Sequence, residues 1–388
     1  MPSVGKKGPP GLECGAMHRL GIDARKIADY GIGSYLQGLL GEFARLDPPG
    51  GMVVLVGSES HHELPDLPES WRLVEVDAPG YSIQEQFAVL LAALRTGVDV
   101  LHVPHYVLPW LLPRRMVVTV HDIIHVLFPE FMPSSLGFAY ARLSIRASVR
   151  RARRVVTVSR TTADDLKRLF GATEDRLRVI PSGVHAEFLG PGDRDEDDAV
   201  RGRLGVSPPY LLHVGNHKPH KNAEGLLKAY QLLANDRRGP VPPLYMVGGF
   251  PPDGELAHRA RAMGLTGKVH CLGHVERNEL AALFRGASAF VYPTLYEGFG
   301  LPVLEAMACG VPVVAGDIQA VREVAGDAVL RVNPRDIVEL AGAVRRLLTQ
   351  ADLCGELCAR GRARAKEYSW EKAAKATWAV YRSVLEES

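Results

Sequence analysis

The feature that most constrains the fold of this chain is a regular alternation of short apolar runs with longer amphipathic stretches, which continues from about residue 17 almost to the end. Short apolar runs predict strands that are buried on both faces, and amphipathic stretches predict the helices that cover them. This pattern is typical of α/β folds with parallel, doubly wound sheets. The 388 residues are enough for two or three such domains.

The predicted elements fall into two sets, one in each half of the chain. In the first half, strands are expected at 18–23, 52–56, 72–76, 99–103, 116–120, 154–158 and 177–180, and helices at 33–46, 82–95, 135–151 and 160–170. In the second half, strands are expected near 210–214, 244–247, 269–272, 289–292, 311–315 and 328–332, and helices near 222–235, 276–286, 302–308, 318–325, 335–349 and 352–366. Because the alternation of strands and helices begins again in the second half, the sequence predicts two doubly wound domains.

The predicted domain boundaries follow changes in composition. Residues 1–16 are rich in Gly, Pro and Lys and are expected to form a flexible tail, whereas 17–190 form the first Rossmann-like domain. The acidic segment 191–200 is expected to be a linker, and 201–369 the second Rossmann-like domain. A closing helix at 370–388 is expected to pack back on the first domain. Ligands of such sheets bind at the carboxyl ends of strands, so we expect a site in a cleft between two facing domains.

The charge and cysteine content narrow the function classes. The chain has 46 Lys and Arg against 44 Asp and Glu, so its net charge of +2 gives no global attraction to nucleic acid. Its five cysteines show no metal-site spacing. No apolar run reaches the ~20 residues of a membrane span, and the first residues lack the apolar core of a signal peptide. These features predict a cytoplasmic protein.

The most informative segment is the glycine-rich stretch that follows the apolar strand ending at Tyr292. Gly298 and Gly300 would let a ligand approach the backbone, and the helix that begins near Leu301 would direct its free N–H groups and positive dipole end at a phosphate. Glu297 and Glu305 flank this loop. Carboxylates repel phosphate but accept hydroxyl groups, so their natural partners are sugar hydroxyls on either side of a diphosphate. The alternative is an ordinary strand, loop and helix with one exposed and one capping glutamate.

A second candidate site segment is the basic loop after the strand at 210–214. Lys218 and Lys221 lie just beyond that strand, and Asn222 is a plausible cap for the next helix. Two ammonium groups there would stabilise the negative charge of a departing diphosphate. An ordinary solvated basic loop is the alternative.

Several motifs in order resemble those of the family-4 retaining glycosyltransferases, which have the two-domain GT-B fold. The stretch EGFGLPVLEAMACGVPVV is similar to the family's E-x7-E signature, and further matches are GIGSY at 31–35, VVTVHDIIHVLFPE at 117–130, VVTVSRTTADDL at 155–166 and HVGNHKPHKN at 213–222. The resemblance implies that Glu297, Gly298, Phe299, Gly300, Leu301 and Glu305 bind a nucleotide-sugar donor and that Lys221 contacts its diphosphate. The family often has Arg where this chain has Asn216, so Lys218 is the expected second cation.

In the first half, polar residues follow the predicted strands. His121 comes after the strand at 116–120, and the resemblance places this histidine near the donor sugar, where it orients the sugar. His105 and Tyr106 are candidates for the acceptor side, with ordinary loop hydrogen bonding as the alternative. Gly33, in a glycine-rich loop that does not complete G-x-G-x-x-G, is expected to approach the diphosphate.

Two further features concern metals and membranes. Asp193-Arg194-Asp195 has the letters of a metal-binding Asp-x-Asp but lies in the predicted linker, so no metal is expected. The helix at 135–151 and the residues after it are basic from Arg142 to Arg154. A solvated surface is one interpretation, and peripheral contact with the inner face of a membrane or with a lipid diphosphate acceptor is the other.

The expected function is transfer of a hexose from a nucleoside-diphosphate sugar to a hydroxyl of a glycan or lipid-linked glycan. The resemblance extends to mannosyltransferases of polysaccharide assembly and so favours GDP-mannose, with no further cofactor. Two alternatives use the same fold: a sugar-nucleotide epimerase or phosphorylase, and a non-catalytic nucleotide-sugar-binding protein. A phosphorylase would carry pyridoxal phosphate, an epimerase would act without acceptor, and a binding protein would neither hydrolyse nor transfer the sugar.

Overall fold

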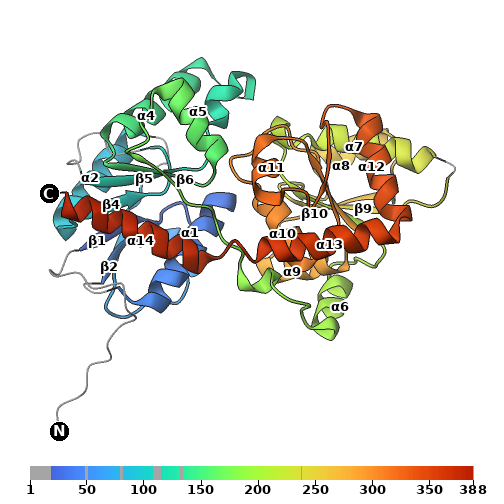
Figure 1. Cartoon of the computed structure of the whole chain (residues 1–388), viewed down its shortest axis with the longest axis horizontal. Helices are drawn as coiled ribbons and strands as arrows, with labels where there is room; N and C mark the ends of the chain where they lie inside the picture. Colours follow the sequence, from blue (N-terminus) through green and yellow to red (C-terminus); the bar gives the residue numbers. More distant parts are fainter. Residues whose placement is uncertain are drawn as a thin grey trace, which may run out of the picture. The chain divides into compact units, whose positions relative to one another are not determined.

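The computed structural model describes residues 19–48, 51–78, 82–107, 115–131, 134–236 and 238–387, so the predicted tail at 1–16 lies outside the described residues. The chain divides into two compact units (Figure 1). Unit 1 comprises Met1–Gly183 and Ser369–Ser388, and unit 2 comprises Val184–Tyr368. Each unit is built around its own parallel sheet, as the alternation in the sequence predicts.

The sheet of unit 1 is entirely parallel and has the order β3-β2-β1-β4-β5-β6-β7. The strands are β1 Leu20–Asp23, β2 Met52–Val56, β3 Arg72–Glu75, β4 Val100–Val103, β5 Met116–Val120, β6 Arg154–Thr157 and β7 Leu177–Val179. The inner strands are buried along their whole length because helices cover both faces. The strand order reverses between β1 and β4, so the carboxyl ends of these two central strands form a topological switch point.

The helices of unit 1 begin at polar caps where the sequence supplies them. They are α1 Tyr30–Leu46, α2 Ile83–Thr96, α3 Ile124–Leu127, α4 Ser135–Arg151, α5 Arg160–Phe170 and α14 Trp370–Glu386, with 3-10 turns at Ser58–Glu63 and Pro129–Phe131. Ser134 caps α4 and Ser159 caps α5, each by accepting a backbone N–H of the first turn. Such caps stabilise a helix by about 1 kcal/mol each.

The last helix, α14, belongs to unit 1 and lies beside α1 (Figure 1). Its Tyr381 hydroxyl lies 2.6 Å from Nδ1 of the buried His102 on β4. A Cβ added to Gly38 of α1 would come within 2.2 Å of the Trp370 ring, so the close approach of α1 and α14 requires glycine at that position. The chain thus returns across 185 residues of unit 2 to complete the core of unit 1.

The sheet of unit 2 repeats the same winding in the order β10-β9-β8-β11-β12-β13, again with all strands parallel. The strands are β8 Leu211–Gly215, β9 Leu244–Gly248, β10 Val269–Gly273, β11 Ala289–Tyr292, β12 Val313–Gly316 and β13 Leu330–Val332. Here the order reverses between β8 and β11. The two sheets confirm the expected α/β class with two Rossmann-like sheets.

The helices of unit 2 include two that the apolar pattern does not predict. They are α6 Arg194–Arg203, α7 Ala223–Asn235, α8 Glu255–Ala262, α9 Arg277–Gly286, α10 Leu301–Cys309, α11 Gln319–Ala325, α12 Ile337–Thr349 and α13 Ala351–Ala365, with 3-10 turns at Ala186–Phe188 and Pro219–Lys221. The unpredicted helices are α6 and α8. Both are short and polar, so they lack the apolar period on which the prediction depends.

The predicted linker at 191–200 is wrong, because most of it lies in α6. Asp193 accepts the backbone N–H groups of Asp195 and Glu196 and so caps the helix. The acidic cluster therefore stabilises a helix N-terminus through the helix dipole. The structure divides the chain between Gly183 and Val184, which is earlier than the expected boundary at 190.

Candidate functional site

The candidate site of unit 2 lies at the switch point of its sheet. β8 ends at Gly215 and β11 ends at Tyr292, and these neighbouring strands point the same way. The loops at 216–222 and 293–300 therefore leave the same edge of the sheet. In doubly wound sheets this edge is where ligands bind.

Several hydrogen bonds hold these two loops together. The carbonyl oxygen of His220 accepts the N–H of Leu295 at 2.7 Å and the hydroxyl of Thr294 at 3.0 Å. Asn222, whose φ is +55°, donates from Nδ2 to the carbonyl oxygen of Pro293 at 3.1 Å. The bonds use backbone groups of both loops, so the loops are fixed relative to each other.

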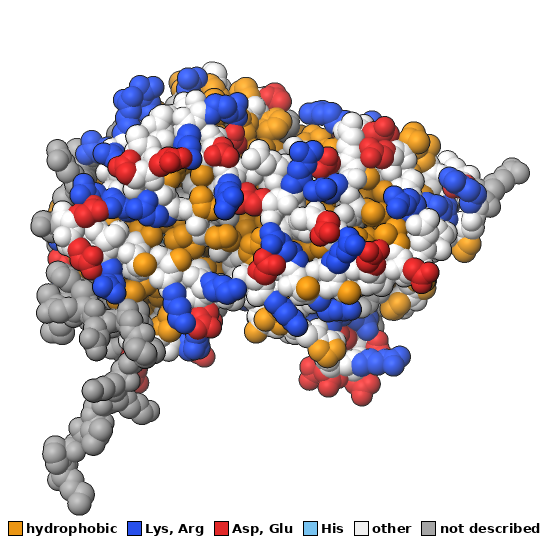
Figure 2. Space-filling model, viewed as in Figure 1, with side chains coloured by type: hydrophobic (Ala, Val, Ile, Leu, Met, Phe, Trp, Pro, Cys, Tyr) orange, Lys and Arg blue, Asp and Glu red, His pale blue; other side chains and the backbone are white. Residues whose placement is uncertain are grey.

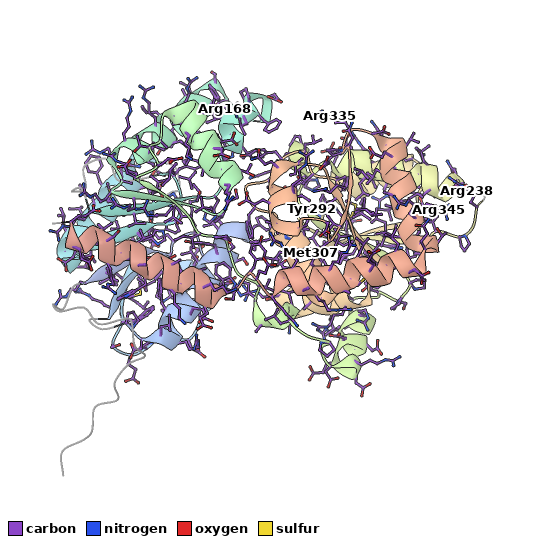
Figure 3. The ribbon with its side chains drawn as sticks, viewed as in Figure 1. Arg168, Arg238, Tyr292, Met307, Arg335 and Arg345 are labelled. Atoms are coloured by element: carbon purple, nitrogen blue, oxygen red, sulfur yellow. The ribbon has the colours of Figure 1, made fainter. Side chains whose placement is uncertain are left out.

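The charged centre of the site is an ion pair between Lys221 and Glu297. Lys221 Nζ donates to Glu297 Oε1 at 2.7 Å, and the same oxygen accepts the hydroxyls of Tyr292 and Thr294, each at 2.8 Å. Tyr292 lies inside unit 2 (Figure 3), and its hydroxyl also accepts from Lys221 Nζ at 2.9 Å. Burial by itself would raise the pKa of Glu297, but Lys221 and the hydroxyl donors outweigh it and lower that pKa, so the carboxylate is ionised at neutral pH.

The pair keeps some hydrogen-bonding capacity for a ligand. An ammonium group has three donors, and Lys221 uses two of them on Glu297 and Tyr292. Within the described ranges, the hydrogen bonds of the Glu297 carboxylate converge on Oε1. One ammonium donor and one carboxylate oxygen therefore remain to bind an anion and a hydroxyl group, respectively.

The start of α10 adds an anion-binding element next to Glu297. Gly300 has φ +104° and is the N-cap, and a Cβ added there would meet nothing within 4 Å. Leu301 is the first helical residue, so its N–H has no acceptor within the helix. Gly298 is buried in the same loop. The side chain of Phe299, in the same loop, is buried and packs edge to face on Tyr368, with the ring centroids 5.8 Å apart.

Glu305 lies on α10 and is 8% exposed. Burial raises the pKa of its carboxyl to about 7; Arg277 opposes the shift and Glu187 adds to it. A carboxyl with this pKa changes charge near neutral pH. Its ability to accept hydroxyl groups therefore depends on pH.

The second expected cation is not part of the ion pair. Lys218 is exposed and forms no ion pair with the described residues, and its backbone N–H donates to Asn216 Oδ1 at 3.1 Å. Asn216 shapes the turn after β8 instead of supplying the charge of an arginine. Lys221 is therefore the lysine that the structure brings to the carboxylate.

In unit 1, His121 follows β5 and is neutral. Burial lowers the pKa of its ring to about 4, with smaller opposing effects of Asp122 and the Pro104 carbonyl. Its Nε2–H donates to the carbonyl oxygen of Pro104 at 3.0 Å, and the ring packs edge to face on Tyr35 at 4.8 Å. This bond fixes the tautomer and leaves Nδ1 as an acceptor.

Gly33 is glycine for a packing reason that the sequence does not show. A Cβ at this position would come within 2.1 Å of the Ile27 carbonyl oxygen, and the Gly33 N–H already donates to Asp29 at 2.6 Å. The N–H of Gly33 is thus engaged within the first turn of α1. Gly31, also in the first turn of α1, is exposed and has open space where a Cβ would be.

A buried charge cluster at the switch point of unit 1 was missed by the sequence prediction. Asp23, at the end of β1, accepts two hydrogen bonds from the Arg25 side chain, and Arg25 also donates to Glu85 at 3.0 Å. His105, after β4, lies 3.7 Å from Asp23. Burial would raise the pKa of Asp23, but Arg25 and His105 hold it well below its usual range. The sequence did contain one indication of this cluster, because the charged Asp23 stands at the end of an otherwise apolar strand.

Tyr106 is engaged with a neighbour. Its hydroxyl lies 2.7 Å from His125 Nδ1, and its carbonyl oxygen accepts the Ser148 hydroxyl of α4. His105 and Tyr106 therefore lie together after β4, with His105 buried and Tyr106 half-buried.

The structure also bears on the Asp-x-Asp letters in α6. Asp193 is a helix cap and Asp195 is in the first turn, so both serve the helix terminus. Across the described part of the chain, no group of three or more His, Cys, Asp and Glu residues has the geometry to hold a metal ion.

Two doubly wound parallel sheets, one with a lysine–glutamate pair beside a helix N-terminus, match the GT-B class of glycosyltransferases. The comparison with known families agrees: residues 31–188 match "Glycosyltransferase Family 4" and residues 195–368 match "Glycosyl transferases group 1". The chain belongs to the family-4 glycosyltransferases and is a glycosyltransferase.

Individual relatives support the same assignment. The O-antigen chain mannosyltransferase B of Escherichia coli is 36% identical over 297 residues, which cover 75% of this chain and 76% of the relative. Among solved structures, the sucrose-phosphate synthase of Thermosynechococcus elongatus has a TM-score of 0.79 at 20% identity and covers 96% of this chain and 100% of its own. Anabaena Alr3699/HepE, solved with UDP and glucose, has a TM-score of 0.74 at 17% identity and covers 94% and 100%. These structures show the fold.

Proposed function

We propose that this glycosyltransferase moves mannose, with retention of anomeric configuration and without a metal ion, from GDP-mannose to a hydroxyl of a glycan or lipid-linked glycan. The observation that carries the proposal is the Lys221–Glu297 pair at the switch point of unit 2, next to the start of α10. It offers one positive donor for a diphosphate and one carboxylate oxygen for a sugar hydroxyl. The likeness to O-antigen chain mannosyltransferase B favours mannose as the transferred sugar.

In the proposed reaction, the bond between the anomeric carbon and the diphosphate oxygen breaks, and the diphosphate leaves with the electron pair. Lys221 and the N–H of Leu301 stabilise the growing negative charge on the leaving group. The acceptor hydroxyl attacks the same face of the sugar, and its proton passes to the departing phosphate oxygen. This sequence balances charge without a protein nucleophile.

The remaining residues bind and orient in this proposal. Glu297 accepts hydroxyls of the donor sugar through Oε2, and Glu305 accepts the ribose hydroxyls. His121 is assigned to the transferred sugar by the family resemblance, and as a neutral ring it would accept one hydroxyl at Nδ1. His105 and Tyr106 are assigned to the acceptor. Lys218 is assigned to the nucleotide as an exposed second cation.

Metal independence is supported by the groups that are present. Lys221 and the helix terminus neutralise a diphosphate in the way that a divalent ion does in other enzymes. The proposal also places the protein in the cytoplasm, where nucleotide sugars would be available to it.

The test is a donor panel on the full chain. Thermal shifts with GDP-, UDP- and ADP-sugars should show the largest stabilisation with GDP-mannose, by about 2.7 kcal/mol at 100 times the dissociation constant. Mannose transfer to a lipid-linked glycan should follow, and the anomeric configuration of the product can be assigned by NMR. Stabilisation by UDP-glucose alone would contradict the donor, and an inverted product would contradict retention. Interconversion of nucleotide sugars without acceptor would indicate the epimerase instead.

A further inference from the structure

Helix α4 of unit 1 has an exposed face that is both basic and apolar. Its buried side consists of Ala141, Ser144, Ile145, Ser148 and Val149, which face the core. The opposite side carries Leu136, which is 81% exposed, and Leu143, which is 53% exposed. These two leucines do not pack in the core of unit 1, because they lie on the side of the helix opposite its buried residues.

The arrangement of residues on this face is regular. Leu136 and Leu143 are seven residues, or about two turns, apart and so lie one above the other along the middle of the exposed face. Exposed Arg142, Arg146 and Arg150, each four residues from the next, lie along one side of the two leucines, and exposed Arg151 lies on the other side. The helix contains no acidic residue. A leucine stripe bordered by arginines is the pattern of a helix that lies in the plane of a membrane interface.

The arginines of α4 differ from those that follow it. Arg153 and Arg154 form ion pairs with Glu387 at the end of α14, so they hold unit 1 together. In contrast, the guanidinium groups of Arg142, Arg146, Arg150 and Arg151 form no ion pair with any described residue. Within the basic region, Arg153 and Arg154 therefore serve the structure of unit 1, whereas the charges of the α4 arginines are available to a partner.

The surface around α4 carries charges of both signs. Figure 2 shows Lys and Arg side chains, with Asp and Glu side chains among them, over the part of unit 1 where α4 and α5 lie in Figure 1. At the end of α4, the side chain of Arg176 donates to the carbonyl oxygen of Arg150, which adds a further guanidinium there. The whole chain has a net charge of only +2, so the concentration of arginines on α4 is local.

We infer that α4 docks unit 1 on an anionic phospholipid bilayer, with Leu136 and Leu143 inserted at the headgroup boundary and Arg142, Arg146 and Arg150 on lipid phosphates. The two leucines favour a bilayer over a nucleic acid, which would contact the arginines but leave the leucines in water. The inference is independent of the donor and of the transfer reaction. It rests on the exposure, spacing and unpaired charge of one helix.

The test is sedimentation of the full-length protein with lipid vesicles. Vesicles of phosphatidylethanolamine and phosphatidylglycerol should bind the wild-type protein at low salt, whereas phosphatidylcholine vesicles should not. Replacement of the three arginines by serine (R142S, R146S and R150S) should weaken binding by roughly five-fold per arginine. The double variant L136S and L143S should weaken binding by about ten-fold or more, and its remaining binding should be more sensitive to salt.

Matched controls come from unit 2. The triple variant K228S, K268S and R346S removes the same charge from exposed cations that form no ion pair with described residues, and L232S with V338S removes two exposed apolar residues. Both controls should bind vesicles like the wild type. All variants should keep the wild-type melting temperature and donor hydrolysis, because none of the changed side chains is buried.

Three results would overturn the inference. They are absence of wild-type binding to anionic vesicles, equal loss of binding in the unit 2 controls, and unchanged binding in the leucine variant. The last result would indicate a purely electrostatic surface. Binding to a DNA duplex as tight as binding to anionic vesicles, lost in the arginine variant but not in the leucine variant, would identify a nucleic-acid surface instead.

Discussion

The two units have the same winding but a different balance of charge at their switch points. In unit 1, one guanidinium, Arg25, lies against two carboxylates, Asp23 and Glu85, and the side chains are at most 8% exposed. In unit 2, Lys221 faces a single carboxylate, Glu297, beside the positive end of α10, and the two side chains are 12–14% exposed. The winding places a candidate site at the carboxyl ends of the strands in both units. We propose the site of unit 2 for the diphosphate, because its ion pair has no net charge and the N-terminus of α10 adds positive potential, whereas the cluster of unit 1 has one more carboxylate than guanidinium groups.

The largest effect is expected at the closed cluster of unit 1. Asp23→Asn should lower the free energy of unfolding by about 3 kcal/mol, because the buried Arg25 loses its closest carboxylate. Urea unfolding measures this loss, and Asp29→Asn, at the more exposed partner of Lys26, is the control with a change below about 1 kcal/mol. If Asp23→Asn were as stable as the wild type but failed to turn over the donor, the cluster of unit 1 would bind substrate. That result would contradict a purely structural role for this cluster.

The next effect is expected at the open pair of unit 2. Lys221→Met should lower kcat/KM for sugar transfer by about 100-fold, because the leaving diphosphate loses the half-buried ammonium group that is proposed to stabilise it. Steady-state kinetics with saturating acceptor measure it, and a thermal melt confirms that the variant folds. Lys218→Met, three residues earlier and exposed, should change kcat/KM only a few-fold. Equal losses of kcat/KM in the two variants would contradict the proposal that Lys221 is the main cation for the leaving diphosphate.

Glu305 should make donor binding pH-dependent. Because the folded protein raises its pKa to about 7 from 4.5, folding favours the protonated form, and stability from this group is lost as pH rises from about 4.5 to about 7. Glu305→Gln should therefore be more stable than the wild type at pH 8, on the order of 1 to 3 kcal/mol. GDP should bind the wild type more tightly as pH rises through about 7, and calorimetry should find the variant about ten-fold weaker at pH 8 and nearly independent of pH. A wild-type affinity that falls over this range would contradict the role of the carboxylate.

The smallest effects are expected at two buried tyrosines of unit 2, where a loss of stability can be distinguished from a loss of the correct position of Lys221 and Glu297. Tyr292→Phe removes the hydroxyl between Lys221 and Glu297, and Tyr210→Phe removes a hydroxyl that donates to the Leu283 carbonyl. Each should cost about 1 kcal/mol of unfolding free energy. Only Tyr292→Phe should lower kcat, with KM for the donor nearly unchanged. If Tyr210→Phe lowered kcat as much, the effect would be general loss of packing.

Much of this fold could be predicted from sequence because the inner strands of its sheets are buried on both faces. The strands β2 and β5 and the helices α4 and α5 fall at the predicted bounds. α6 was missed because its acidic first turn resembles a polar linker until Asp193 is seen to cap it. The site loops were also predictable, since a glycine-rich turn and lysines after strands have a local signal.

The partners of the site residues could not be predicted in the same way. Tyr292 reaches Lys221 across 71 residues, and Arg25 reaches Glu85 across 60, so these contacts depend on which strands become neighbours. Phe299 and Gly33 carry local signals of a ligand loop, but their packing against Tyr368 and the Ile27 carbonyl is a property of the folded chain.

The most direct measurement is a crystal structure of the full chain with GDP bound. The diphosphate should lie within hydrogen-bonding distance of Lys221 Nζ and the Leu301 N–H, with the ribose hydroxyls on Glu305. A diphosphate bound instead after β1 and β4, beside Arg25 and His105, would contradict the assignment of the donor to unit 2.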